Sequence, residues 1–376
     1  MSSAPSSDLV VELARAADDA GVRRLLRDNP MRGDIRVSLE REPSALLAAT
    51  IEGERHDTLV ARERLGGRVV GMGSRSVLPA WVNGEPCRLG YLSQLRLEGS
   101  HRRRRRLLAA GYALARGLRR PDETAFDVTT IIADNQAARR LLERGLPGLP
   151  RYHELERFLT LVLPSNRLRQ RPRPTGFRIE RAGEADLPAV AACLERNRRR
   201  YQFAARFTVE DLRSPERSRG LRPEDFQLAV AGSELIGCLA LWDQTSFKQV
   251  VVRGYSRRLM LLRPWINLVA PLIGVPRLPA SGRGLPHGVV SHVAVDDDRA
   301  DVFLALLAAA LGDAGARKHA CVLVGLAARH PWRAEVERRY GVRRYESVIY
   351  AVHEDAGADE VRRLDGRLPH LEVALL

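Results

Sequence analysis

The chain has 376 residues, of which 45% are hydrophobic and 28% charged, and this composition excludes disorder along its whole length. At this length it can hold two or more domains, each with a core of its own. The formal net charge of +15 predicts a basic surface that attracts anionic ligands, acidic proteins, anionic lipids or nucleic acids.

The four cysteines (Cys87, Cys193, Cys238 and Cys321) are scattered and have neither metal-ligand nor disulfide-scaffold spacing. We expect free thiols in a reducing cytoplasm and no metal. The first ten residues lack the basic and apolar regions of a signal peptide, which also favours a cytoplasmic protein. The most hydrophobic stretch, Leu259–Val275, is too short and too interrupted to span a bilayer, although it could cover a groove or touch a membrane surface.

Hydrophobic periodicity in the first 164 residues predicts a mixed α/β sheet with helices on its faces. The expected strands are Leu9–Arg15, Thr58–Arg64, Arg68–Leu78, Arg88–Leu97, Ala125–Ile132 and Tyr152–Leu163. The expected helices are Asp18–Asp28, Ser44–Ile51, His101–Leu118 and Asn135–Arg144. Asp18 and Asn135 are the expected N-caps, and Gly145 is the expected C-cap.

The sequence also contains an internal repeat. Arg15-Ala16 aligns with Arg181-Ala182 at an offset of 166 residues, and the same offset places Arg68–Gly73 on Glu234–Leu239. Two landmarks at one offset indicate two copies of one structural unit.

Further along the chain the offset increases. Leu92–Glu98 aligns with Val290–Asp296 at 198 residues, and Leu141–Gly145 aligns with Glu337–Gly341 at 196. The second copy therefore carries about 32 extra residues. We expect a first domain over 1–164, a linker over 165–176, and a second domain over 177–376 with an insertion at about 240–288.

Five consecutive arginines, Arg102–Arg106, lie between a strand pattern and a helix pattern. Backbone N–H groups, the helix dipole and guanidinium groups converge at such a junction, so the run predicts a phosphate site. A solvated charged face is the alternative. The second copy has DDRADVFLA (Asp297–Ala305) at the aligned position, and its acidic residues would repel phosphate.

The order β-α-α-β-β-β-α-β-α-β, with an arginine-rich loop after the fourth strand, resembles the GNAT N-acyltransferase superfamily, here as a tandem pair. Leu95-Arg96-Leu97-Glu98-Gly99 matches the end of that family's fourth strand, and Arg102 matches its first loop position. Asn135, followed by Ala138, Leu141, Leu142 and Gly145, matches its second helix.

The resemblance implies an N-acyltransferase that uses acyl-CoA, by default acetyl-CoA, to acylate an amine on a small molecule or peptide. The CoA-binding residues that it implies are Leu95, Arg96, Leu97, Arg102, Arg103, Arg104, Arg105, Arg106, Leu107 and Asn135. Arg105 and Leu107 replace small residues of the family pattern, which predicts a wider loop with guanidinium contacts.

The family's usual tyrosine acid is missing, because its position holds Leu141 or Leu142. Catalytic candidates are Tyr91 on the fourth strand, Asp134 after the next strand, and Tyr152. Each has an ordinary structural alternative: Tyr91 as a half-buried core residue, Asp134 as a turn or cap residue, and Tyr152 as a packed strand residue.

We expect the second copy to have lost CoA binding and to help shape the acceptor pocket through its insertion. Trp242, Asp243, Gln244 and His292 are candidates to line a cleft, although His292 on an apolar strand is more often a core residue. The run Arg196–Tyr201 reads as a solvated helix end.

Two other functions stay open. The basic surface also suits an N-acyl synthase that takes its acyl group from an acidic acyl carrier protein. Alternatively, the chain is a catalytically silent GNAT-like module that binds a protein or nucleic acid, although it lacks the interleaved aromatic and basic residues used for stacking on bases. The oligomeric state is open as well.

Overall fold

The computed structural model describes residues 8–31, 33–101, 105–165, 175–270 and 277–376. The strands of the first half are β1 (Leu9–Leu13), β2 (Ile35–Glu40), β3 (Arg55–Glu63), β4 (Val69–Val82), β5 (Glu85–Leu97), β6 (Glu123–Ile132) and β7 (Arg151–Pro164). Its helices are α1 (Asp19–Asp28), α2 (Ala45–Ala49), α3 (Arg105–Gly117) and α4 (Gln136–Leu142).

The second half has a related order, without a counterpart of β2 and with β11, α7 and α10 in addition. Its strands are β8 (Arg178–Arg181), β9 (Phe226–Ala231), β10 (Glu234–Trp242), β11 (Gln249–Tyr255), β12 (His287–Val295), β13 (Cys321–Ala327) and β14 (Arg343–His353). Its helices are α5 (Leu187–Arg198), α6 (Val209–Arg213), α7 (Arg257–Val269), α8 (Ala300–Ala316), α9 (Trp332–Tyr340) and α10 (Ala358–Arg362).

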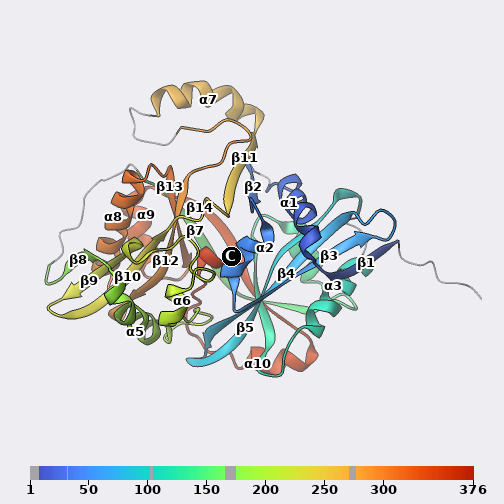
Figure 1. Cartoon of the computed structure of the whole chain (residues 1–376), viewed down its shortest axis with the longest axis horizontal. Coiled ribbons are helices and arrows are strands. Elements are labelled where there is room, and N and C mark those ends of the chain that lie inside the picture. The colour runs from blue at the N-terminus through green and yellow to red at the C-terminus, as the bar shows by residue number, and fades with distance from the viewer. Residues whose placement is uncertain (1–7, 32, 102–104, 166–174, 271–276) are drawn as a thin grey trace, which may run out of the picture.

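Twelve strands form one mixed sheet in the order β1-β3-β4-β5-β6-β14-β7-β13-β12-β10-β9-β8 (Figure 1). The two halves exchange their last strands, because β14 lies between β6 and β7, while β7 lies between β14 and β13. The expected mixed sheet with helices on its faces is therefore confirmed, and the exchange joins both halves into a continuous structure.

The alternation of side chains along each strand places helices on both faces of the sheet. In β10, Cys238, Ala240 and Trp242 pack in the cluster that contains residues of α5, whereas Leu239 and Leu241 pack in the cluster that contains residues of α8. The first half follows the same rule, with α1 on one face and α3 on the other. Apolar burial on both faces is the main stabilising contribution to such a layered fold.

A second, two-stranded sheet joins the halves through residues far apart in sequence. β2 pairs antiparallel with β11, so that Ile35 lies opposite Tyr255. The sequence analysis did not predict β2. This strand pairs only with β11, which lies in the insertion of the other half, so it is not part of the main sheet that the repeat indicates. β11 leads into α7, which projects from the body of the molecule at the top of Figure 1.

The expected caps are partly realised. The Asn135 side chain accepts a hydrogen bond from the Ala138 N–H at 3.3 Å and caps α4. Gly145 adopts a φ of 59° just beyond this helix. Asp18 does not cap α1; its carboxylate accepts the Arg15 N–H at 2.8 Å and also pairs with Arg62.

Candidate functional site

The most distinctive feature of the first half is the separation of two parallel strands. The pairing between β5 and β6 ends at Leu92 and Thr129, although β5 continues to Leu97 and β6 to Ile132. The Thr129 hydroxyl donates to the Leu92 carbonyl at 2.7 Å at the point of separation. We call the region beyond this point the first splay. It leaves the β6-facing edge of β5 without a strand partner from Ser93 to Arg96, within the described residues.

A β-bulge shapes β5 at the first splay. Met72 of β4 pairs with Arg96 of β5, and Ser74 pairs with Ser93, so β5 has one residue more than β4 between these two pairs. The extra residue, Gln94, has a φ of 57°. Bulges of this kind redirect backbone groups and are frequent beside functional sites. Ser93 Oγ and Gln94 Oε1 are both buried and have no hydrogen-bond partner among the described residues. Buried polar atoms without partners are costly, so this position favours a polar ligand.

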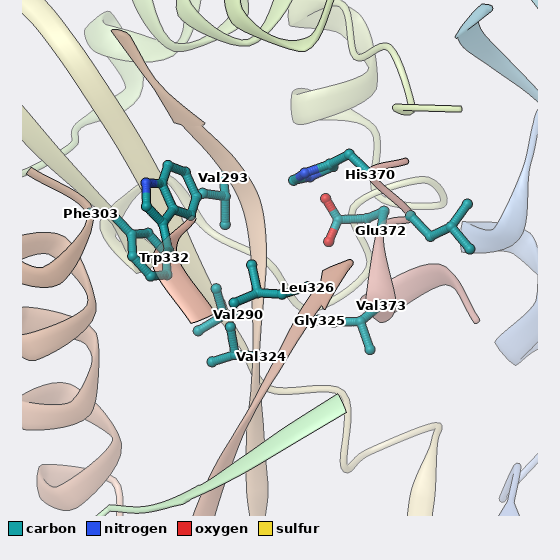
Figure 2. A pocket seen from close by; sticks show the side chains of 11 residues that line it. Val290, Val293, Phe303, Val324, Gly325, Leu326, Trp332, His370, Glu372 and Val373 are labelled. Carbon is teal, nitrogen blue, oxygen red and sulfur yellow. The ribbon is translucent and has the colours of Figure 1, made fainter. Parts of the chain in front are cut away.

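The second half contains the same separation, which we call the second splay, but there it is filled. The pairing of β12 with β13 ends at Val289 and Leu323, and residues 370–373 enter between the strands. Figure 2 shows His370, Glu372 and Val373 beside β12 and β13 around a cavity of only about 10 Å³. This space is barely enough for one water molecule. The second splay therefore has no room for a substrate.

Glu372 shows what the bulge of the second splay can hold. His292, the bulge residue there, donates its backbone N–H to Glu372 Oε2 at 3.0 Å. The same oxygen accepts from Arg198 Nη2 at 2.6 Å, and both side chains are almost fully buried. The bulge N–H thus binds an oxyanion supplied by the chain itself. This observation indicates the chemistry available to the equivalent bulge in the first splay.

Helix α3 begins beside the strand that carries the first bulge. Arg105 and Arg106 in its first turn are exposed, whereas Arg102, Arg103 and Arg104 lie outside the described residues. Leu107 is 8% exposed and packs with Leu9, Ala61 and Val70. Its side chain is therefore a core residue, and only its backbone is available to a ligand.

The other residues expected to bind CoA lie around the first splay or at its rim. Leu95 is 41% exposed on β5, while Leu97 is half-buried against the cluster that holds Leu107. Arg96 donates to the Leu95 carbonyl at 2.9 Å, and burial, together with nearby Arg41, lowers the pKa of Arg96. The Asn135 side chain is engaged as the helix cap described above.

A row of polar side chains crosses the sheet beside the first splay. His56 on β3 lies opposite Ser76 on β4, which lies opposite Tyr91 on β5, so all three share the α1 face. His56 Nδ1 is 2.8 Å from Ser76 Oγ, and the Tyr91 hydroxyl is 2.8 Å from Thr130 Oγ1. Burial raises the pKa of Tyr91, which keeps its phenol protonated near neutral pH. The structure thus places Tyr91 one residue before the splay begins.

Glu52 is the centre of a buried charged cluster at the end of this row. Its carboxylate pairs with Arg41, lies 3.4 Å from Lys248 Nζ, and lies 3.4 Å from His56 Nδ1. Burial tends to raise the pKa of Glu52, but Arg41, Lys248 and His56 bring it below its usual value. Glu52 is therefore ionised near neutral pH although it is only 2% exposed.

Burial has the dominant effect on the two bases of this cluster. It lowers the pKa of His56 below the usual histidine value, so the ring is neutral near pH 7. It lowers the pKa of Lys248 to about 8. Lys248 comes from the insertion of the second half and donates to the carbonyl groups of Ala374 and Leu376, each at 3.2 Å. The cluster thus joins three distant parts of the chain beside the sheet.

The three candidate catalytic residues are not brought together. Tyr152 lies in the cluster with Leu92 and Ile131, on the face opposite Tyr91, and its hydroxyl is 2.6 Å from that of Tyr112. Burial raises the pKa of Tyr152 well above its usual value. Asp134 is exposed in the turn after β6. Of the three, only Tyr91 lies on the polar row.

The sequence analysis missed His56, Glu52 and Lys248. His56 and Thr58 share one face of β3 with buried Val60, and two polar side chains on an inward face are the signal that could have identified the row. Glu52 and Lys248 gave no local signal, because they meet only through the pairing of the insertion with the first half.

Two expectations about the second half need correction. The run Arg196–Tyr201 lies at the end of α5 but is only partly solvated: Arg196, Arg199 and Arg200 are exposed, whereas Arg198 is 1% exposed and Tyr201 is 6% exposed. The proposed cleft residues Trp242, Gln244 and His292 are buried in the core instead. Asp243 binds His319 Nε2 at 2.9 Å. These side chains hold the second half together rather than lining an opening.

Among the described residues, no group of three or more histidine, cysteine, aspartate or glutamate side chains is arranged to hold a metal ion. None of the helices in the described part of the chain is long and apolar enough to cross a membrane.

Comparison with known proteins identifies the fold. No protein-family model matches the sequence, and no curated protein does. Among solved structures, a GCN5-related N-acetyltransferase from Sphaerobacter thermophilus is similar over 92% of this chain and 96% of its own, with a TM-score of 0.55 and 15% identity.

Two further structures extend this likeness. A GCN5-related glucosamine N-acetyltransferase region of a fungal multi-domain GH3 β-N-acetylglucosaminidase matches 93% of this chain and 38% of its own, with a TM-score of 0.61 and 13% identity. Saccharomyces cerevisiae N-myristoyltransferase with bound myristoyl-CoA matches 94% and 81%, with a TM-score of 0.60 and 13% identity. The chain therefore has a GNAT-like fold, as its sequence pattern predicts.

Proposed function

We propose that the chain is an N-acyltransferase that binds an acyl-CoA in the first splay and transfers the acyl group to an amine. One observation carries the proposal. The first splay leaves Ser93 Oγ and Gln94 Oε1 buried without partners among the described residues, whereas the second splay is filled by the chain itself. The fold supports the same conclusion, because structures similar to this chain are described as N-acetyltransferases and as an N-myristoyltransferase with bound myristoyl-CoA.

Two parts of the site would bind the acyl-CoA donor: the arginine run and the bulge of β5. The run Arg102–Arg106, of which Arg105 and Arg106 are described and exposed, would contact the CoA phosphates. The edge of β5 from Ser93 to Arg96, which faces the first splay, would hold the acyl-carrying arm. The backbone N–H at the Gln94 bulge would donate to the thioester oxygen, by analogy with the His292 N–H that binds Glu372.

The polar row supplies groups for proton transfer. The acceptor nitrogen attacks the thioester carbon, a C–N bond forms, the C–S bond breaks, and the nitrogen loses a proton. His56 is neutral near pH 7 and lies 3.4 Å from the Glu52 carboxylate, which would stabilise the ring once it is protonated. We assign His56 as the base, acting through water. Tyr91, which stays protonated, is the hydroxyl best placed to return a proton to the leaving thiolate.

The experiment that tests this function is a thiol-release assay with acyl donors of increasing chain length and a panel of amines. Acetyl-CoA is the first donor, and acyl carrier protein loaded with the same acyl group is the comparison. We expect release from CoA thioesters that depends on the amine, and at least a tenfold loss of kcat/KM in the Arg105→Ala/Arg106→Ala variant.

The matched control is Arg257→Ala/Arg258→Ala, which removes two exposed arginines from the first turn of another helix. If thiol is released only from the acyl carrier protein, that protein and not CoA is the donor. Absence of release from every donor would favour the catalytically silent binding module.

A further inference from the structure

Helix α7 exposes its apolar face, whereas an ordinary surface helix buries that face against the protein. No residue of the helix is buried, and Leu261, Trp265 and Leu268 are 75%, 70% and 67% exposed. Their spacing of four and three residues places them on one face. This apolar stripe points away from the protein, because the less exposed residues Arg263 and Asn267 lie on the opposite side of the helix.

The polar side of α7 is already used by the protein. Arg263 Nε donates to the Leu278 carbonyl at 3.1 Å, and Asn267 exchanges two hydrogen bonds with the Leu278 backbone, at 2.7 and 3.0 Å. Arg263 also stacks over Tyr255, 5.7 Å from the ring centre. These contacts fix the rotation of the helix, so the apolar stripe is not free to turn inward.

The charges on the chain segment that carries α7 have a single sign, and the one acidic neighbour at its N-cap Ser256 is exposed Asp34, which precedes β2. The 52 residues from Gln244 to Val295 contain seven lysines and arginines and no aspartate or glutamate. Arg257, Arg258, Arg277 and Arg283 are exposed, and none of them forms an ion pair with another described residue. The projecting element therefore combines an outward apolar stripe with unneutralised positive charge.

We propose that α7 binds the surface of an anionic lipid bilayer, lying parallel to it. Leu261, Trp265 and Leu268 would enter the boundary between headgroups and acyl chains, and Arg257 and Arg258 would contact lipid phosphates. Interfacial helices share these features: an apolar face, a tryptophan and a basic flank without acidic residues. A second copy of the chain is a poorer partner, because two elements of the same positive charge repel. The proposal stands independently of the proposed acyl transfer.

Flotation with lipid vesicles tests the proposal on the full chain. We expect co-flotation with vesicles containing roughly 30% phosphatidylglycerol in phosphatidylcholine, and at least tenfold less with phosphatidylcholine alone. The Leu261→Ser/Trp265→Ser/Leu268→Ser variant should lose at least tenfold in the lipid partition coefficient. The Leu65→Ser control, which changes a 90% exposed leucine far from α7 in the sequence, should bind as the native chain does.

Fluorescence provides a second readout on the same vesicles. The other three tryptophans, Trp81, Trp242 and Trp332, are at most 5% exposed, so a blue shift on adding vesicles reports Trp265. Trp265→Phe should abolish the shift but leave flotation within threefold of native. Arg257→Gln/Arg258→Gln should weaken flotation, whereas Arg105→Gln/Arg106→Gln should not.

Three results would each overturn the proposal: no binding to anionic vesicles, full binding by the triple serine variant, or a native dimer that the triple variant converts to monomer. The last would make the stripe an interface between copies. Acyl transfer in solution does not depend on any of these outcomes, so failure here is distinguishable from failure of the proposed function.

Discussion

Gln94 in β5 and His292 in β12 are equivalent residues, 198 positions apart, and each is the extra residue of a β-bulge, with φ of 57° and 51°. Their surroundings differ in one respect that matters for function. The backbone N–H of His292 binds Glu372, whose segment fills the second splay. Gln94 borders the first splay, where buried polar atoms are without partners among the described residues. The same fold thus carries one splay that the chain itself fills and one whose bulge keeps buried polar atoms without described partners.

The first prediction concerns the carboxylate that fills the second splay. Glu372→Gln keeps an acceptor for the His292 N–H but removes the charge that pairs with buried Arg198. Leaving a buried charge without its partner typically costs about 3–5 kcal/mol. We expect a loss of that order in the free energy of unfolding, measured with denaturant. Glu346→Gln, which breaks an exposed pair with Arg157, should cost less than about 1 kcal/mol. Equal costs would contradict a structural role for Glu372.

A second prediction concerns the proposed base. His56→Gln should lower kcat by on the order of a hundredfold, the usual contribution of a general base. The thermal shift produced by CoA should not change, because His56 is assigned to proton transfer and is not among the residues proposed to bind CoA. His153→Gln, at an exposed histidine on β7, is the control and should leave kcat unchanged. A native kcat in the His56 variant would remove that residue from the mechanism.

A third prediction concerns Gly90, which lies where β5 and β6 are paired. A Cβ on Gly90 would lie 1.8 Å from Asp127 Oδ1 and 2.6 Å from Arg75 Nη2, inside a buried ion pair. Overpacking of this kind costs about 1–3 kcal/mol, so Gly90→Ala should lower Tm. Gly111→Ala, in α3 with nothing within 4 Å of the added carbon, should raise the free energy of unfolding by up to about 1 kcal/mol. A stable Gly90→Ala variant would show that this ion pair can rearrange.

The fourth prediction is acid sensitivity of the second half. Burial lowers the pKa of His330 from 6.5 to about 4, so the folded state binds this proton less readily than the unfolded state. The stabilising contribution is complete above pH 6.5 and is lost as pH falls toward 4. Each such histidine contributes a slope of up to about 1.4 kcal/mol per pH unit. His330→Phe should flatten the loss of stability between pH 6.5 and 5, measured by denaturant titration; an unchanged slope would exclude His330 as its source.

Much of the fold was predictable, because strands such as β5 and β6 and helix α1 bury one face and so carry local periodicity. The repeat aligns Gln94 with His292 from the sequence alone. The exchange of β7 and β14 was not predictable, since a strand's pattern records burial and not the identity of its neighbours.

The site was harder to predict than the fold. Tyr91 was found because a period of two places it on the same strand face as Leu95 and Leu97. Glu52 and Lys248 are almost 200 residues apart in sequence, and they meet where the insertion pairs with the first half. Leu107 was assigned from its motif position, yet its side chain faces the core. Arg198 looked like part of a solvated run, and only Glu372, 174 residues further along the chain, explains its burial.

The central claim is that the first splay, and not the second, binds CoA. Calorimetric titration with CoA tests it most directly, because it counts sites. We expect one molecule per chain, with binding lost in Arg105→Ala/Arg106→Ala and unchanged in Arg257→Ala/Arg258→Ala. Two molecules per chain, or none, would contradict it.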